Sequence, residues 1–374
     1  MRSVVPASAP SADEPMRSRV AVLGLGGVGR ALLELLVKEE SVAAQQLAVV
    51  AVSDSKHTLS AREGHVLSTA AVRAVLAAKS SGSGLASVAV DAGTCQLHAG
   101  ALVLAPRLLV ADCSAADTSE WLLSALAGGA SVALANKKPL CAPQAVFAQL
   151  TADSRRFRAE STVGAGLPVH TALRRQLAAG DAVSRVAGCF SGTLGVVCSG
   201  LQAGSPFSLV VRDAKEQGFT EPDPRDDLSG LDVARKALIL ARLLGWRLEL
   251  GQVTVESLYP PSMGPDLLTT EQFMAALPSL DAEFAHKAAQ AAADGCVLRY
   301  VATVENCCCS VGLRAVAKDS PLGRLQGTDN LVEVWSSVYD QAPFVIQGRG
   351  AGAAATASGV LADLLELRDC QTWC

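Results

Sequence analysis

The sequence predicts an α/β protein in which a doubly wound parallel sheet is followed by a second domain of α+β structure. Two changes of pattern carry this prediction. Up to about residue 156, continuously apolar strands alternate with helices, as in parallel sheets that are covered on both faces. From about residue 157, longer strands, hairpins and irregular loops take over. With 374 residues, 50% of them hydrophobic, the chain is long enough to bury two cores.

The first strand, glycine turn and helix read RVAVLGLGGVGRALLELLVKEE. Gly24, Gly26 and Gly29 give the spacing G-x-G-x-x-G. The first glycine permits a tight turn, the second permits close approach of a pyrophosphate, and the third permits packing of the helix against the strand. Together with Gly27 and Val28 in the same turn, these residues predict a Rossmann-type domain that binds NAD or NADP.

The second strand, QLAVVAVSDS, ends beside a candidate for the ribose contact. Asp54 follows the last glycine of the turn by about 25 residues, where an acid that binds the ribose 2′-hydroxyl of NAD is expected. Ser53, Ser55 and Lys56 surround this acid and could instead hold the 2′-phosphate of NADP. The sequence leaves both cofactors open.

Two further strands, at 107–114 and 131–138, alternate with helices at 118–129 and 144–154. Ligands of doubly wound sheets bind at the carboxyl ends of the strands. The residues expected on loops that face the cofactor there are Asp112, Cys113 and Ser114, and then Asn136 and Lys137. The alternative for each is a cap of the following helix.

The second half of the chain contains a β-hairpin at 297–316 that turns near Glu305 and Asn306, and another strand at 330–339. The last segment, 345–368, has a glycine-rich turn and a long helix. We expect a disordered N-terminal extension at 1–18, a dinucleotide-binding domain at 19–156, a second domain at 157–344, and a C-terminal segment at 345–374 that returns to the first domain.

The stretch EPDPRDDLSGLDVARKALILAR places a lysine on the apolar side of a helix. Ser229 and Asp232 resemble an N-terminal capping pair, so the helix is expected to begin at Leu231. At about 100° per residue, Asp232, Lys236 and the apolar Ile239 share one stripe. A partly desolvated lysine beside an acid can serve as a proton donor near neutral pH. The alternative is an ordinary surface pair of residues i and i+4.

Composition excludes several classes of protein. The formal charge of −4 and the lack of a basic cluster argue against nucleic acid as a partner, and no apolar run approaches the length of a membrane span. The eleven cysteines show no paired spacing, and the consecutive Cys307, Cys308 and Cys309 would point to alternate faces of a strand. Reduced thiols in a cytoplasmic protein are the expected state.

Seven segments together resemble homoserine dehydrogenase, most closely the short form without an appended kinase or regulatory domain. They are GLGGVG, NKKP, ESTVGAGLPV, CFSGTLG, GFTEPDPRDDLSGLDVARK, LQGTDN and GRGAGAAATASGVLADL, in the order and approximate spacing of that family. The resemblance covers roughly residues 19–368. It implies reversible hydride transfer between a nicotinamide cofactor and L-aspartate 4-semialdehyde, which gives L-homoserine in threonine and methionine biosynthesis.

The same resemblance assigns roles to the acidic stretch. Lys236 matches the proton-donating lysine, and Asp232 matches the acid that orients it and contacts the substrate. Glu221 matches the residue that holds the substrate's α-ammonium group, with Asp227 nearby. Gly218 is a further expected substrate contact.

Other positions match the family's cofactor, cation and dimer contacts. Lys137 matches a residue near both the nicotinamide and the substrate, and Gly350 matches a glycine that contacts the cofactor. Glu160 and the carbonyl groups of Val163, Ala165 and Leu167 match a site for a monovalent cation, Na⁺ or K⁺. A homodimer formed through the sheet of the second domain is also implied.

Two features depart from the family pattern. Gly195, Val196 and Val197 stand where many members have an aromatic residue, and Arg349 replaces a small residue in the glycine turn. Two other functions are alternatives: a semialdehyde oxidoreductase with an activated cysteine, and a dinucleotide sensor without catalytic activity.

Overall fold

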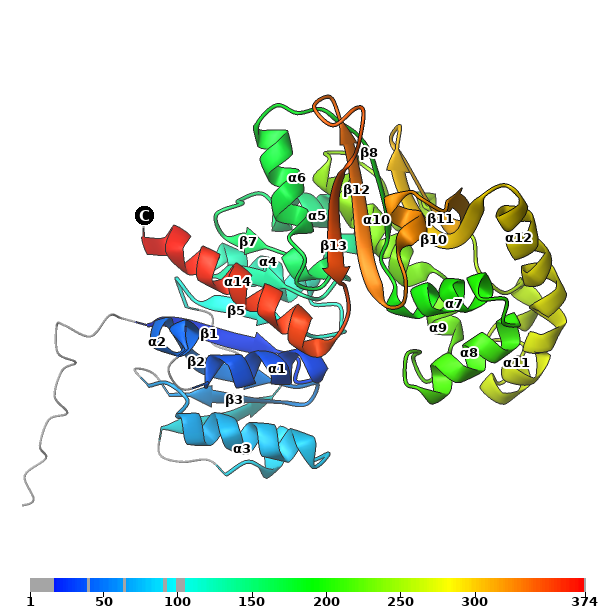
Figure 1. Cartoon of the computed structure of the whole chain (residues 1–374). Helices are drawn as coiled ribbons and strands as arrows, with labels where there is room; N and C mark the ends of the chain where they lie inside the picture. Colours follow the sequence, from blue (N-terminus) through cyan, green and yellow to red (C-terminus); the bar gives the residue numbers. More distant parts are fainter. Residues whose placement is uncertain (1–16, 39–40, 63–64, 90–92, 99–104, 373–374) are drawn as a thin grey trace, which may run out of the picture.

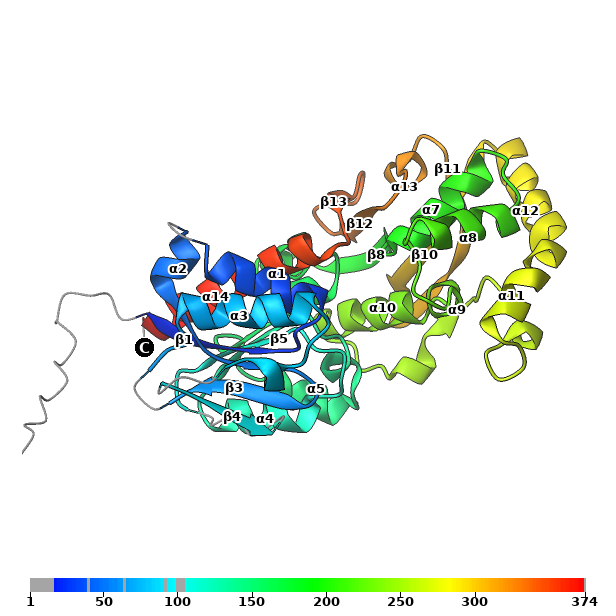
Figure 2. The same cartoon turned by 90° about the horizontal axis from the view of Figure 1, so that it is seen from below.

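The computed structural model describes residues 17–38, 41–62, 65–89, 93–98 and 105–372. Figures 1 and 2 show two sheets side by side, each with its own helices. The first sheet is mostly parallel and the second is mostly antiparallel, so the predicted α/β class is confirmed. Of the extension predicted at 1–18, residues 1–16 lie outside the described residues, and Ser18 already begins β1.

The first sheet has the strand order β4-β3-β2-β1-β5-β6-β7. Strands β1, β2, β5, β6 and β7 are parallel, and the order reverses direction at β1. This reversal is the switch point at which doubly wound sheets bind ligands. The strand bounds are β1 Ser18–Leu23, β2 Leu47–Ser53, β3 His57–Ala61, β4 Thr94–His98, β5 Leu109–Asp112, β6 Ser131–Leu134 and β7 Phe157–Arg158.

Strands β3 and β4 are an antiparallel extension that the sequence analysis did not predict. Their sequences, HTLSA and TCQLH, are short and partly polar, so they lack the apolar run that marked the other strands. Because β2 turns directly into β3, the residues around Asp54 form a tight turn rather than an open loop.

Helices cover both faces of the first sheet. They are α1 Gly27–Leu36, α2 Val42–Gln46, α3 Thr69–Ser80, α4 Ser119–Ala127, α5 Gln144–Leu150 and α14 Ala353–Thr372. The C-terminal helix α14 lies beside α1 and contacts β5 and β6, as the red helix in Figure 1 shows. Residues of α1 and α14 therefore share one core, which includes Leu32, Leu33, Val360 and Leu364.

The second sheet has the order β13-β12-β8-β10-β11-β9. Its strands are β8 Val183–Cys189, β9 Thr254–Val255, β10 Cys296–Glu305, β11 Cys308–Ala317, β12 Asp329–Ser336 and β13 Phe344–Arg349. Its helices are α6 Val169–Ala178, α7 Gly192–Gln202, α8 Phe207–Glu216, α9 Arg225–Leu228, α10 Leu231–Leu243, α11 Thr270–Ala276, α12 Asp281–Ala293 and α13 Pro321–Arg324. The start of the segment 345–368, predicted as a glycine-rich turn before the long helix, belongs to β13, because it pairs with β12.

The predicted hairpin is formed by β10 and β11. Asn306 and Cys307 make its turn, both with positive φ, the backbone conformation that two-residue hairpin turns require. Cys308 is exposed and Cys309 is buried, as predicted for neighbouring strand residues, but Cys307 lies in the turn and is also exposed, so the three cysteines do not alternate throughout. Within the described residues, no helix is both long and apolar enough to cross a membrane.

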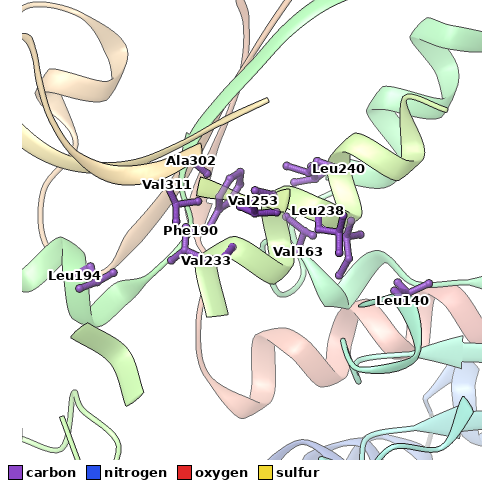
Figure 3. Packing of buried hydrophobic residues seen from close by; sticks show 14 of the residues in the cluster. Leu140, Val163, Phe190, Leu194, Val233, Leu238, Leu240, Val253, Ala302 and Val311 are labelled. Atoms are coloured by element: carbon purple, nitrogen blue, oxygen red, sulfur yellow. The ribbon is translucent and has the colours of Figure 1, made fainter. Parts of the chain in front are cut away.

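Helix α10 lies against the inner face of the second sheet. Figure 3 shows Val233 of this helix near Phe190 and Val311 of the sheet side, with Leu238 near Val163 further along the helix. Val233, Leu238 and Leu240 are at most 1% exposed, so burial of this helix face fixes the helix against the sheet.

The start of α10 corrects one detail of the sequence analysis. The helix begins at Leu231, as expected, but its N-cap is Gly230 and no side chain caps it. The Ser229 hydroxyl accepts from the N–H of Leu231, and the Asp232 carboxylate points to two lysines instead. Gly230 has φ 73°, and a Cβ there would clash with the Tyr300 hydroxyl, so only glycine fits between α9 and α10.

Candidate functional site

The glycine turn between β1 and α1 lies at the switch point of the first sheet. Gly24 has φ 84°, and a Cβ there would come within 2.6 Å of the backbone of Ser114. A Cβ on Gly29 would clash with the carbonyl oxygen of Gly24. Around Gly26, by contrast, no heavy atom of the described residues, apart from the adjoining chain, lies within 4 Å of a Cβ position. Gly24 and Gly29 thus close the turn, while Gly26 and Gly27 are exposed at the N-terminus of α1, where anions bind.

This contrast predicts different effects for two alanine substitutions. Gly26→Ala should change the free energy of unfolding by less than about 1 kcal/mol but weaken dinucleotide binding about tenfold, because a methyl group would project toward the pyrophosphate. Gly29→Ala should cost about 2 kcal/mol or more, because the methyl group overlaps a carbonyl oxygen. Urea denaturation and calorimetric titration with the dinucleotide measure both quantities. Equal stability of the two variants would contradict this division of roles.

The N-terminus of α14 lies beside the glycine turn. A Cβ on Gly27 would be 3.4 Å from the Cβ of Ala353, the first residue of α14. Gly350 precedes this helix, and its carbonyl oxygen accepts from the Asn330 side chain at 3.2 Å. Two helix N-termini therefore converge at the expected phosphate position. Arg349 is exposed at the end of β13.

Asp54 is part of the tight turn between β2 and β3. Its carboxylate accepts from the backbone N–H groups of Lys56 and His57 at 2.9 and 2.8 Å, from Lys79 Nζ at 3.0 Å and from the N–H of Leu85 at 3.3 Å. Partial burial opposes ionisation, but these hydrogen bonds outweigh it and lower the pKa of Asp54 to about 2. The carboxylate is thus already occupied within the protein.

The polar residues at the ends of β5 and β6 bind one another. The Asn136 amide donates to Asp112 Oδ2 at 3.1 Å, to Ser114 Oγ at 3.2 Å and to the carbonyl oxygen of Ala116 at 2.8 Å. Asp112 also accepts from the N–H of Ser114 and from Thr118 Oγ1. Asp112 and Asn136 are buried, whereas Ser114 is partly exposed beside the glycine turn.

Two lysines from different parts of the chain share the carboxylate of Asp232. Lys236 Nζ lies 2.8 Å from Asp232 Oδ2, and Lys137 Nζ lies 3.3 Å from Asp232 Oδ1. Lys236 Nζ also donates to the Phe190 carbonyl oxygen at 2.6 Å. The Lys236 side chain is 12% exposed, so it is partly desolvated, as the sequence analysis expected. Lys137 follows β6 of the first sheet, so the cluster spans the contact between the two halves of the molecule.

The electrostatics of this cluster keep Asp232 ionised. Burial alone would raise the pKa of Asp232, but the charges and hydrogen bonds of Lys236 and Lys137 hold it well below its usual range. Burial lowers the pKa of Lys137; the charge of Asp232 opposes this shift and the charge of Lys236 adds to it. An ammonium group held beside a carboxylate in such a cluster can release a proton to a neighbouring oxyanion of a substrate.

A second acidic group, Asp227, is close enough to Asp232 to feel its charge. Asp227 accepts from the N–H of Glu221 at 2.8 Å and from Thr193 Oγ1 at 3.1 Å. Burial raises the pKa of Asp227, and the charges of Glu221 and Asp232 raise it further. Clustered acids of this kind favour a cationic ligand. Gly218 follows the C-cap of α8 and has φ 73°, and among the described residues no side chain or distant backbone atom lies within 4 Å of where its Cβ would be.

The remaining residues of the acidic stretch pair locally. Arg225 is buried and binds the Asp223 carboxylate through Nε and Nη2, and it also donates to the carbonyl oxygen of Leu268. Asp223 and Arg225 thus stabilise the loop itself. Asp223 is therefore engaged within the loop, which leaves Glu221 and Asp227 as the candidate ligand contacts of this stretch.

The segment predicted to bind a monovalent cation forms a 3₁₀ turn and a loop in front of α6. The Glu160 carboxylate accepts from the N–H groups of His170 and Thr171 and from Thr171 Oγ1, so it stabilises the N-terminus of α6. Ala165 has φ 58°. In the described part of the chain, the carbonyl oxygens of Val163 and Ala165 accept no hydrogen bond, whereas that of Leu167 accepts from the N–H of Val169.

Cys113 and Cys198 do not have the properties of an activated nucleophile. Burial, and then the charge of Asp112, raise the pKa of the Cys113 thiol well above its usual range. Burial likewise raises the pKa of Cys198 to about 11. A nucleophilic cysteine needs the opposite shift. This observation disfavours a semialdehyde oxidoreductase that forms a covalent thioester.

Comparison with known proteins places this arrangement in a family. A family model described as homoserine dehydrogenase matches residues 168–365. The homoserine dehydrogenase of Paracoccidioides brasiliensis is 41% identical over 258 residues, which cover 65% of this chain and 69% of the fungal protein. The chain belongs to the homoserine dehydrogenase family.

Two further comparisons show how much of a longer family member the chain covers and how similar its fold is to that of a distant member. A chloroplastic bifunctional aspartokinase/homoserine dehydrogenase of Zea mays is 41% identical over 274 residues, which are 70% of this chain but only 29% of the maize protein. A hyperthermophilic archaeal homoserine dehydrogenase in complex with NADPH shares the fold, with a TM-score of 0.69, 20% identity and coverage of 94% of this chain and 97% of its own.

Sequence reasoning missed two groups at this site. The Phe190 carbonyl oxygen holds Lys236, and Thr193 orients Asp227. A backbone acceptor leaves no signal in a sequence. The segment CFSGTLG that carries both residues was recognised only as part of the resemblance, and the signal available was its position immediately after an apolar strand.

Proposed function

We propose that this protein catalyses the reversible NAD(P)-dependent interconversion of L-aspartate 4-semialdehyde and L-homoserine. The observation that supports this activity best is the cluster of Lys236, Asp232 and Lys137 beside a dinucleotide-type glycine turn. Membership of the homoserine dehydrogenase family agrees with it. A dinucleotide sensor would need the glycine turn but not the two lysines that share an acid.

Each residue of the cluster has a distinct role in the proposed reaction. A nicotinamide cofactor held by the glycine turn would supply hydride to the aldehyde carbon in reduction and would take it from the alcohol carbon in the reverse reaction. As that carbon is reduced, its oxygen becomes an alkoxide, and Lys236 donates a proton to it. Asp232 holds the Lys236 ammonium group in place, and Lys137 adds positive charge next to the same oxygen. Glu221 and Asp227 bind the α-ammonium group of the substrate, which is the cationic ligand that their charges favour.

The direct test of this reaction follows absorbance at 340 nm with purified protein, L-homoserine and either NAD⁺ or NADP⁺. Reduction of the cofactor is the expected result, and the reverse reaction should consume reduced cofactor with L-aspartate 4-semialdehyde. Folded protein that binds the dinucleotide but reduces neither cofactor would instead favour the sensor.

The occupied state of Asp54 leads to a prediction about the cofactor. Because its carboxylate already binds Lys79 and three backbone N–H groups, it is not free to select a ribose 2′-hydroxyl. Ser55 and Lys56 are exposed in the same turn and suit a 2′-phosphate. Lys56→Ala should therefore raise the KM for NADP⁺ about fivefold or more and leave the KM for NAD⁺ unchanged. Equal changes for both cofactors would contradict this placement of the phosphate.

The cation and the dimer are further parts of the proposal. The free carbonyl oxygens of Val163 and Ala165 support binding of Na⁺ or K⁺. The test is to add either chloride to the metal-stripped protein and to measure the melting temperature, which a bound cation should raise.

Exposed apolar side chains near the β12 and β13 end of the second sheet support a homodimer: Val338 is 68% exposed, and Tyr339 and Val345 are each 38% exposed. A monomer mass in light scattering at micromolar concentration would contradict the dimer.

A further inference from the structure

Arg242 of α10 has a guanidinium group that is fully buried and fully hydrogen-bonded. Its side chain is 0% exposed. Nε and Nη2 donate to the Leu248 carbonyl oxygen at 3.0 and 2.8 Å, and Nη2 also binds Glu249 Oε2 at 2.9 Å. Nη1 donates to the carbonyl oxygens of Leu140 and Ala142, each at 2.7 Å. Every N–H donor of the guanidinium group is therefore used.

The two hydrogen bonds from Nη1 join α10 to the segment that follows Lys137. The carbonyl oxygen of Lys137 accepts from the N–H of Leu140 at 3.1 Å, and the carbonyl oxygen of Leu140 accepts from Arg242. A continuous chain of hydrogen bonds thus runs from the backbone of Lys137 to α10, the helix that carries Asp232 and Lys236. Because Lys137 follows a strand of the first sheet, this chain connects the two halves of the molecule at the lysine cluster.

Glu249 adds a second connection between the same two parts. Its Oε2 binds Arg242, and its Oε1 accepts from the N–H of Gln144, the first residue of α5, at 2.9 Å. The guanidinium group of Arg242 also lies over the ring of Phe147 in α5, with 5.1 Å between Cζ and the ring centroid. Arg242 and Glu249 therefore bind the whole stretch from the 3₁₀ turn Pro139–Cys141 to α5.

The other polar contacts between α10 and the segment 137–142 are weaker. Apart from the lysine contact itself, one further hydrogen bond joins the two among the described residues, and in it Cys141 Sγ lies 3.8 Å from the Arg235 carbonyl oxygen. In the ion pair of Lys137 and Asp232, 28% and 44% of the two side chains are exposed. An ion pair with this exposure contributes little free energy, so it does not by itself hold the two segments together.

The arrangement around Arg242 fits a role beyond stability. A buried charge is weak evidence for stability, because apolar residues of similar volume often stabilise a core equally well. Hydrogen bonds, unlike apolar contacts, fix the distance and direction between the groups that they join. The proposed reaction needs Lys137 and Lys236 next to one substrate oxygen, and a displacement of about 1 Å can change a rate by a large factor.

We propose that Arg242 is a positioning residue for the reaction: it holds Lys137 beside Asp232 and Lys236 by binding the backbone of the segment 137–142. Its effect on turnover rests on the proposed function, whereas the placement of Lys137 does not.

The first measurement tests the placement of Lys137 and needs no turnover. In protein labelled with ¹³C at the lysine Cε, the signal of Lys137 is assigned by its loss in Lys137→Met, and a pH titration gives its pKa. Asp232→Asn should lower the pKa of Lys137, because the charge of Asp232 raises it. In Arg242→Lys this effect of Asp232→Asn should fall to less than about half, because lysine offers at most three donors and the segment can move away.

Arg299→Lys is the matched control for Arg242→Lys. Arg299 of β10 is also buried, at 2% exposed, and its guanidinium donates to Gln202 Oε1 and to the carbonyl oxygens of Leu298, Leu322, Gly323 and Leu325. Its replacement removes a comparable set of hydrogen bonds without touching the segment 137–142. The effect of Asp232→Asn on the pKa of Lys137 should therefore stay at its wild-type value. An equal reduction in both arginine variants, or none in Arg242→Lys, would overturn the proposal.

A variant of the acid partner keeps the proposal testable if Arg242→Lys does not fold. The Glu249 side chain is 50% exposed, so Glu249→Ala should be tolerated. It removes the connection to Gln144 and the carboxylate that holds Nη2. The effect of Asp232→Asn on Lys137 should fall in the same direction by a smaller amount, and an unchanged effect would contradict the role of Arg242.

The second measurement tests the consequence for the rate. The kcat of Arg242→Lys should be about tenfold lower or less, with the KM for the dinucleotide within about twofold of the wild type. In a Lys137→Met background the same substitution should lower kcat by less than about twofold, because the residue that Arg242 positions is already absent. An equal loss in both backgrounds would make Arg242 merely structural. A wild type without turnover would remove the proposed reaction, and the titration of Lys137 would still decide the placement.

Discussion

Lys236→Met should lower the turnover of L-aspartate 4-semialdehyde reduction by about 10²-fold to 10⁴-fold while the protein stays folded. Methionine keeps the apolar stem of the side chain, so packing on α10 is preserved. What is lost is the ammonium group that Asp232 and the Phe190 carbonyl oxygen hold in place. General acid catalysis contributes a factor of this size. Stopped-flow measurement of NADPH oxidation gives the rate, and calorimetric titration gives the affinity for the dinucleotide, which should not change.

The matched control for Lys236→Met is Lys138→Met. Lys138 is exposed and adjacent to Lys137, so its replacement removes the same charge from the same region without touching Asp232. Its turnover should remain within about twofold of the wild type. A similar loss in both variants would mean that overall positive charge, rather than the placed ammonium of Lys236, supports the rate. Loss of soluble folded protein in Lys236→Met alone would make the lysine structural.

The residues that sequence reasoning predicted best are those whose roles depend on local geometry. The spacing of Gly24, Gly26 and Gly29 predicted a strand, a turn and a helix. Gly24 and Gly29 are required by close backbone contacts within the turn or with the end of the adjacent strand, whereas Gly26 leaves open space at the start of the helix. The pairing of Asp232 with Lys236 also follows from helix geometry, since residues i and i+4 share a face.

Contacts between distant segments were harder to predict. Lys137 and Asp232 meet because the end of β6 in the first sheet faces the start of α10 beside the second, and no local pattern records that approach. Asp54 shows the same limit. The distance from the glycine turn suggested a ribose contact, but the unpredicted strand β3 bends the chain so that Lys79 and the N–H of Leu85 bind the carboxylate.

The cap of α10 was predicted wrongly for a physical reason. A serine three residues before an acid is a common capping pattern, yet here the turn between α9 and α10 requires φ 73° at Gly230, and that glycine takes the N-cap position. The Asp232 carboxylate is thereby left for the two lysines instead of for the backbone. A residue withheld from capping in this way is a candidate for function rather than for helix stability.

Asp232→Asn should lower turnover by about 10²-fold and change the pH dependence of the reaction. Its carboxylate raises the pKa of Lys137, against the lowering by burial and by the charge of Lys236. Without it, Lys137 loses its proton at lower pH, so the alkaline limb of kcat/KM for reduction should move to lower pH. Asp226→Asn, an exposed acid of the same loop, is the matched control and should leave the profile unchanged.

The stability of Asp232→Asn supplies an independent check of the same contact. The folded-state pKa of Asp232 is depressed, so the carboxylate stabilises the fold at any pH above its unfolded-state pKa, and this contribution is lost as the pH falls toward the folded-state value. The wild type should therefore be more stable than the variant at pH 7, and urea denaturation should show the difference shrinking below about pH 4. A difference that stays constant down to pH 3 would show that the two lysines do not depend on the charge of Asp232, and the assignment of this cluster would fail.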